Sequence, residues 1–120
     1  MTPQEYCKQK TKESRSSFLT AFIFLSKEKR EALTALYAFC REVDDIADEC
    51  LDHEIASRKL NWWRDEIDRL FKDAPQHPVS KALYPFIEHF NLSKNYFIEI
   101  IDGKINLRRF LTASLQFPNQ

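Results

Sequence analysis

Apolar and polar positions alternate along this chain with the period of an α-helix. Residues 27–50 place one apolar side chain in each turn, within about 60° of one another on a helical projection: Leu36, Cys40, Val43 and Ala47. Similar stripes lie over residues 53–71, 79–90 and 94–105, and residues 18–25 are apolar almost all round. That last run fits a short buried helix, with a strand as the alternative. The pattern predicts an all-α protein of five to six helices joined by short loops.

Capping residues mark where several of these helices begin. Thr2 and Glu5 have the spacing of a capping box, and Pro3 between them suits the first position of a helix. Other residues that favour a helix start stand just before the later stripes: Ser26, Asp52, Pro78 and Ser93.

The helix predicted over residues 27–50 carries a polar stripe directly beside its apolar one. Its members recur about once per turn: Tyr37, Arg41, Asp44 and Asp48. Asp44 shares its direction with the predicted core. An ionised carboxylate is rarely placed there unless it is paired or bound to a metal, because its desolvation is costly. We therefore expect the functional site on this stripe.

Asp44 and Asp48 stand four residues apart, so their carboxylates project from one helix face and repel each other. Mg²⁺ suits such a pair, because it takes one or two carboxylates and completes its shell with water and substrate phosphates. Arg41 offers donors that match phosphate oxygens, and Tyr37 adds a hydroxyl. The stripe thus suggests a site for a diphosphate leaving group.

Simpler interpretations stay open for both candidate binding stretches. The acids could form a solvated helix end in which Arg41 pairs with Asp45 or Asp44. The run from Ser14 to Ser17 could bind phosphate at a helix start, or its hydroxyls could only cap that helix.

Composition narrows the classes of function. The chain has 120 residues, which suggests one domain, and its formal net charge is zero with the two signs interspersed, which argues against a nucleic-acid partner. Its three cysteines lack metal-ligand spacing and are expected to be reduced thiols. The run from Phe18 to Leu25 is too short to span a membrane. We expect a cytoplasmic protein, with peripheral membrane contact left open.

The sequence resembles the squalene/phytoene synthase family, and within it the bacterial presqualene diphosphate synthases. The most specific matching stretch is Ala35 to Glu49, with the letters ALYAFCREVDDIADE. Shorter matches precede and follow it: Ser16-Ser17-Phe18, Trp62 to Ile67, Gln76 to Val79, and Ile100 to Gly103. Together they divide the chain into a family-like part, residues 1–107, and a divergent tail, residues 108–120.

The resemblance implies the N-terminal part of an isoprenoid-synthase-type fold and an Mg²⁺-dependent prenyltransferase. Such an enzyme joins two farnesyl diphosphates head to head, giving presqualene diphosphate for squalene or hopanoid synthesis. Condensation of geranylgeranyl diphosphate, as in phytoene synthesis, is the alternative. The implied roles are metal binding by Asp44 and Asp48, with Asp45 as a further candidate ligand, and diphosphate contact by Tyr37 and Arg41. Substrate contact is implied for one more stretch: Ser14, Arg15, Ser16, Ser17 and Phe18.

The sequence departs from the family pattern in one important respect. Family members carry a second aspartate-rich motif on a later helix, and nothing after Asp48 in these 120 residues supplies it. We therefore expect this stretch to act as an N-terminal portion that is inactive alone. It could instead be a non-catalytic helical fragment, could self-associate, or could require a missing C-terminal half.

Overall fold

The computed structural model describes residues 1–14 and 26–103, which form five helices and no strand. The helices are α1 (Pro3–Ser14), α3 (Lys27–Glu49), α4 (His53–Phe71), α5 (Pro78–His89) and α6 (Lys94–Ile101). The predicted all-α class is confirmed. The short helix expected over residues 18–25 and the divergent tail from residue 108 lie outside the described residues, and the boundary at 107 stays a prediction.

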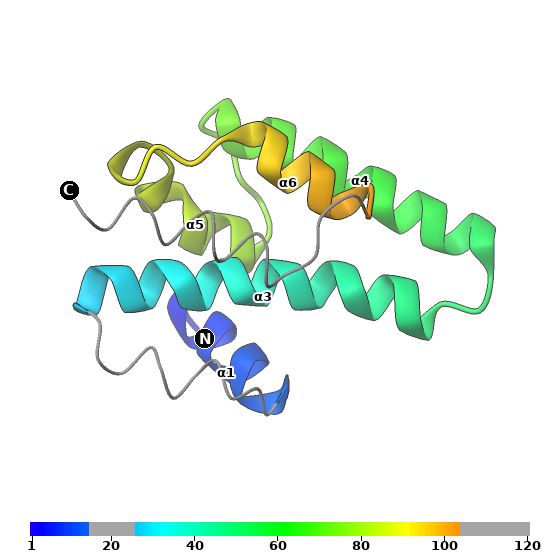
Figure 1. Cartoon of the computed structure of the whole chain (residues 1–120), viewed down its shortest axis with the longest axis horizontal. Helices are drawn as coiled ribbons and strands as arrows, with labels where there is room; N and C mark the ends of the chain where they lie inside the picture. Colours follow the sequence, from blue (N-terminus) through cyan, green and yellow to red (C-terminus); the bar gives the residue numbers. More distant parts are fainter. Residues whose placement is uncertain (15–25, 104–120) are drawn as a thin grey trace.

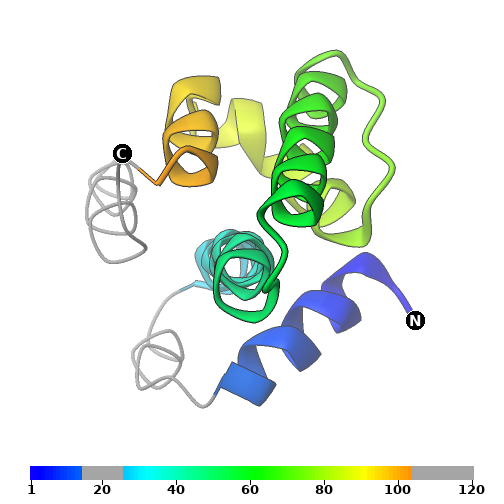
Figure 2. The ribbon, with the colours of Figure 1, turned by 90° about the vertical axis from the view of Figure 1, so that its right-hand side faces the viewer.

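Helix α3 is the longest of the five and contacts each of the other four. It runs along the long axis of the molecule in Figure 1, and Figure 2 looks almost along it, with α1 on one side and α4 and α6 on the other. Every residue from Ala32 to Cys40 is buried. The helix predicted to carry the functional stripe is therefore also the centre of the core.

An aromatic cluster joins three helices at the middle of α3. The Phe39 ring is fully buried and meets Trp63 of α4 and Phe97 of α6 edge to face, with centroids 5.5 Å and 5.3 Å away. Such pairs add roughly 0.5–1.5 kcal/mol to the burial of their area. The neighbouring Trp62 is 41% exposed, so only one ring of the tryptophan pair belongs to the core.

The predicted helix starts are confirmed by their hydrogen bonds. The backbone N–H of Glu5 donates to Thr2 Oγ1 at 3.0 Å, and that of Thr2 donates to Glu5 Oε1 at 3.2 Å, which is a complete capping box. Side-chain oxygens of three further caps accept backbone N–H bonds at the starts of α3, α4 and α6: Ser26, Asp52 and Ser93. Pro78 opens α5, as expected, and His77 caps it through Nδ1, which accepts from the Val79 N–H at 3.0 Å.

Each of the helices α4, α5 and α6 is followed, two positions after its last residue, by a residue with positive φ: Asp73 (66°), Asn91 (52°) and Gly103 (74°). At the end of α5 the Leu92 N–H donates to the Ile87 carbonyl at 2.9 Å and the Asn91 N–H to the Glu88 carbonyl at 3.2 Å. This pair of bonds defines the Schellman motif, which satisfies carbonyls at a helix end. Of these three positions, only Gly103 carries the residue type that a positive φ favours.

Residues 50–52 connect α3 to α4, and this short connection is largely exposed to solvent. Leu51, at its centre, is 96% exposed.

Helix α4 packs beside α6, and Arg64 links the two helices. Its guanidinium donates to Asp102 Oδ1 from Nε at 3.1 Å and from Nη2 at 2.5 Å. Lys94 and Asp68 form a second ion pair between these helices.

Candidate functional site

The predicted polar stripe of α3 divides into residues that have partners and residues that have none. Tyr37 is 4% exposed, Asp44 is half-buried and Asp48 is exposed. None of these three has a hydrogen bond or ion pair to another described residue. Arg41, by contrast, donates from Nη2 to Asp45 Oδ1 at 2.8 Å. The sequence-based alternative, in which Arg41 pairs with Asp45, therefore describes this structure.

Asp44 occupies an unfavourable electrostatic position. Burial raises the pKa of its carboxyl above the usual value, the nearby Arg41 lowers it, and the Asp48 and Asp45 carboxylates raise it further. The raised pKa means that the surroundings do not fully compensate the ionised form. A half-buried carboxylate whose charge a nearby arginine only partly offsets is the kind of group that a bound cation would stabilise.

The metal-binding capacity of this stripe is limited to its carboxylate pair. Among the described residues, no group of three or more His, Cys, Asp or Glu side chains could hold a metal ion. Zinc, which takes four protein ligands in structural sites, is thus a poor fit. Mg²⁺ fits better, because it binds through one or two carboxylates and keeps water and phosphate oxygens in its shell. Asp44 and Asp48 satisfy that requirement.

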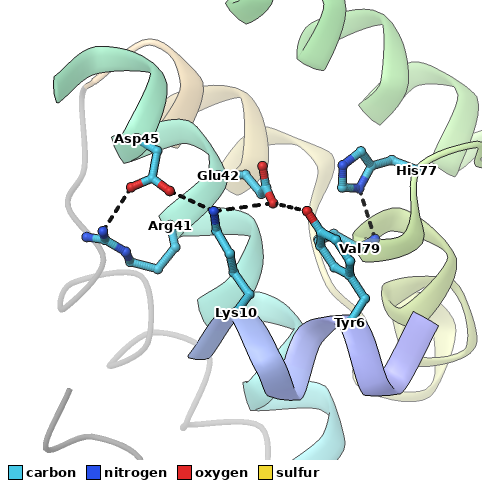
Figure 3. A network of polar contacts seen from close by, with 7 residues as sticks. All are labelled: Tyr6, Lys10, Arg41, Glu42, Asp45, His77 and Val79. Carbon is cyan, nitrogen blue, oxygen red and sulfur yellow. Dashed lines mark hydrogen bonds and ion pairs between the residues drawn. The ribbon is translucent and has the colours of Figure 1, made fainter. Parts of the chain in front are cut away.

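Beside this stripe, a network of polar side chains joins α1 to α3 (Figure 3). Lys10 of α1 reaches Asp45 Oδ2 at 2.7 Å and Glu42 Oε1 at 3.6 Å. The Tyr6 hydroxyl donates to the same Glu42 oxygen at 2.5 Å. Burial lowers the pKa of Lys10, but the two carboxylates outweigh it and raise the pKa above its usual value. Lys10 is therefore held in its charged form.

Sequence reasoning missed both α1 side chains of this network, and it missed Glu66. Glu66 on α4 is 0% exposed, yet it accepts the backbone N–H groups of Gln76 and His77 at 2.8 Å and 2.7 Å and the Arg69 Nε–H at 2.8 Å. These bonds fix the loop before α5. Glu66 stands three residues after Trp63 and four before Leu70, so it shares the buried face of α4, and this spacing is the signal that could have indicated its burial.

The remaining predicted substrate contacts fall largely outside the described residues. Ser14 is the last residue of α1, and Arg15, Ser16, Ser17 and Phe18 are not described. Their predicted contacts with substrate stay predictions.

Two of the three cysteines are poor candidates for a nucleophile because they are buried. All three are free, and Cys7 and Cys40 are buried. Burial raises the pKa of the Cys7 thiol to about 12 and also raises that of Cys40, so both stay protonated at neutral pH.

A pocket of about 350 Å³ opens between α4 and α5, near Phe71, Asp73 and Tyr84. It contains no residue of the α3 stripe.

No helix in the described part of the chain is long and apolar enough to cross a membrane.

Comparison with known proteins places these features in a family. A family model described as squalene/phytoene synthase matches residues 11–113. The chain belongs to the squalene/phytoene synthase family. The match includes all of α3, and with it the unpaired carboxylates and the Arg41–Asp45 pair.

Individual relatives in this family carry different names. The presqualene diphosphate synthase of Rhodopseudomonas palustris is 42% identical over 106 residues, which cover 88% of this chain and 36% of the relative. That of Sinorhizobium fredii is 39% identical over 90 residues, which cover 73% of this chain and 31% of the relative. NADH dehydrogenase (ubiquinone) complex I, assembly factor 6, of Rattus norvegicus is 30% identical over 94 residues, which cover 78% and 28%.

The chain spans about a third of the length of the curated relatives it matches. No solved structure matches it.

Proposed function

We propose that this chain forms the first diphosphate-binding wall of an Mg²⁺-dependent head-to-head prenyltransferase that makes presqualene diphosphate from farnesyl diphosphate. The observation that carries the proposal is Asp44, a half-buried carboxylate that forms no ion pair with the rest of the described residues, one helical turn from Asp48. The 36–42% identity to presqualene diphosphate synthases supports the reaction class and this choice of substrate.

Asp44 and Asp48 are the residues that would hold Mg²⁺ in this proposal. Bound there, the ion would neutralise part of the charge on the departing diphosphate. Arg41 would contribute guanidinium donors to the diphosphate oxygens, which it suits by its planar shape and permanent charge. The buried Tyr37, one turn before Arg41, would offer its hydroxyl as a further donor. Each role uses a side chain that α3 already fixes in place.

Two alternatives share the same fold. The family description covers phytoene synthases as well, so a longer substrate, geranylgeranyl diphosphate, is the nearest competing choice. A non-catalytic role is the second alternative, and the assembly factor among the relatives favours keeping it. The two α3 carboxylates favour the enzyme, because a purely structural helix gains nothing from a half-buried Asp44 that pairs with no other residue in the described part of the chain.

Calorimetric titration with inorganic diphosphate in the presence of Mg²⁺ tests the site. We expect the 120-residue chain to bind, and Asp44→Asn to weaken binding by about tenfold or more, since a charge-assisted contact is typically stronger than a neutral one. Asp65→Asn is the matched control, because Asp65 is an exposed α4 carboxylate that lies outside the site. Equal binding by Asp44→Asn and the parent chain would contradict the proposal.

Product analysis with farnesyl diphosphate and Mg²⁺ tests the activity of these 120 residues. We expect binding without turnover, because the second aspartate-rich motif implied by the family is not in this sequence. Presqualene diphosphate formed by the 120 residues would overturn that expectation and would itself support the reaction. A failure to bind any diphosphate would instead favour the non-catalytic alternative.

A further inference from the structure

Asp45 differs from its two neighbours in the motif because both of its carboxylate oxygens already have partners. Oδ1 accepts from Arg41 Nη2 at 2.8 Å, and Oδ2 accepts from Lys10 Nζ at 2.7 Å. The Asp45 side chain is 20% exposed, and those of Lys10 and Arg41 are 22% and 34% exposed. A metal at Asp45 would have to share the carboxylate with two charge-assisted hydrogen bonds, and the adjacent Lys10 and Arg41 cations would repel the ion, which is unfavourable in a partly buried setting.

The charges of this network also balance. Lys10 and Arg41 each carry one positive charge, and Glu42 and Asp45 each carry one negative charge, so the four sum to zero. Figure 3 shows them as a continuous row, from Arg41 through Asp45 and Lys10 to Glu42, that crosses from α3 to α1. Asp44 and Asp48 stand outside the row and form no ion pair with another described residue, and their two negative charges match one divalent cation.

We propose that Asp45 is a positioning residue that fixes the Arg41 guanidinium at the edge of the site, and that Lys10 of α1 holds Asp45 in place. Asp45 is then not a metal ligand. The identity of the group that Arg41 contacts rests on the proposed function. The fixing of the Arg41 guanidinium by Asp45 does not rest on it. The i, i+4 spacing brings Asp45 and Arg41 together on α3, and only the packing of α1 brings in Lys10.

Nuclear magnetic resonance of the free chain tests the fixing without any ligand. The guanidinium hydrogens of Arg41, assigned with Arg41→Lys, should exchange with water several-fold faster in Asp45→Asn than in the parent chain. Lys10→Met should accelerate this exchange less, and Lys10→Arg should restore it. Lys81→Met is the matched control, because Lys81 is exposed on α5. Unchanged Arg41 exchange in Asp45→Asn, with the helix content intact by circular dichroism, would overturn the proposal.

Diphosphate titrations at several Mg²⁺ concentrations separate a positioning role from metal ligation. A lost metal ligand, as in Asp44→Asn, should raise the Mg²⁺ concentration needed for half-maximal binding. Asp45→Asn should leave that requirement unchanged and weaken diphosphate binding by about tenfold, as Arg41→Gln should. The double variant should be no weaker than either single one, because both remove the same contact.

The outcomes of the two experiments are distinct. A raised Mg²⁺ requirement in Asp45→Asn would show that Asp45 is a ligand and would overturn the positioning role. Additive losses in the double variant would also overturn it. If the parent chain binds no diphosphate, the proposed function fails, and the exchange measurement alone still decides whether Asp45 fixes Arg41.

Discussion

Asp44 shows how a single residue can favour binding at the expense of stability. Its pKa is raised, chiefly by burial, so the folded state holds its proton more tightly than the unfolded chain does. This group therefore favours folding at acid pH, and its ionisation at neutral pH disfavours folding.

Asp44→Asn is accordingly expected to stabilise the metal-free chain at pH 7. The variant removes the repulsion from Asp48, and like charges at this spacing cost about 0.5 kcal/mol. Urea unfolding followed by circular dichroism gives the free energy of unfolding. Asp65→Asn, by comparison, should change it little, since substitutions at exposed positions away from special features have small effects. An Asp44→Asn variant less stable than the parent chain would mean that the carboxylate has a stabilising partner.

Glu66 has the opposite dependence on pH. Burial raises the pKa of this carboxyl, but the backbone N–H groups of His77 and Gln76 and the Arg69 guanidinium outweigh that effect and lower the pKa below 4.5. A lowered folded-state pKa gives stability that is complete above the ordinary value and is lost as pH falls through the folded value. The stability that the Glu66 bonds supply should therefore begin to fall near pH 4.5, and it is lost as the pH drops through the lower folded-state pKa.

Glu66→Gln tests this assignment. We expect a loss of about 1.5–3 kcal/mol at pH 7, the range for hydrogen bonds to charged groups. The variant should also lose less stability than the parent chain between pH 4.5 and pH 3, because it no longer titrates at this position. Urea midpoints across that pH range are the measurement. If the parent chain and Glu66→Gln lost the same stability between pH 4.5 and pH 3, the acid sensitivity would not arise from Glu66.

At the scale of elements, the sequence predicted helix starts better than the backbone conformation after helix ends. Thr2, Ser26, Asp52 and Ser93 were identified because an N-cap is a local contact, made with a backbone N–H two or three residues away. The stripes over residues 53–71 and 79–90 predicted where α4 and α5 end to within one residue, but they did not predict the positive φ of Asp73 and Asn91, because a positive φ is favoured by glycine and these positions carry other residues.

Asn91 allows the end of α5 to be tested directly. At φ 52°, Asn91→Gly should leave the chain equally stable or improve it, whereas Asn91→Val should cost about 1–2 kcal/mol, because Cβ branching strains the left-handed conformation. Thermal unfolding of both variants measures the difference. Equal melting temperatures would contradict the conformational argument, since only the valine carries a Cβ.

The candidate site shows the same division between local and distant information. Periodicity along one helix sufficed to place Tyr37, Arg41, Asp44 and Asp48 on a common stripe, and to suggest an Arg41–Asp45 pair. It could not reveal that Lys10 and Tyr6 complete the network, because they lie 35 and 36 positions from their partners and meet them only through the packing of α1 on α3. Glu66 was missed for a similar reason: its backbone partners lie ten and eleven residues ahead.

At the scale of the whole molecule, α3 serves the core and the candidate site together. Its residues from Ala32 to Cys40 pack against the other described helices, and its last turns carry Asp44 and Asp48. The site is thus built on the most constrained element, which agrees with the precision that a diphosphate and metal would require.

The exposed connection after α3 has a practical consequence. Leu51, 96% exposed and three residues from Asp48, is a favourable place for a protease to cut between described residues. Chymotrypsin should nick the chain there, and Mg²⁺ with diphosphate held by Asp48 should slow the nick, as mass spectrometry of timed digests can show. Asp44→Asn should lose that protection. The rate of cleavage at Leu51 would then measure how much of the candidate site is occupied, even in a chain that catalyses no reaction.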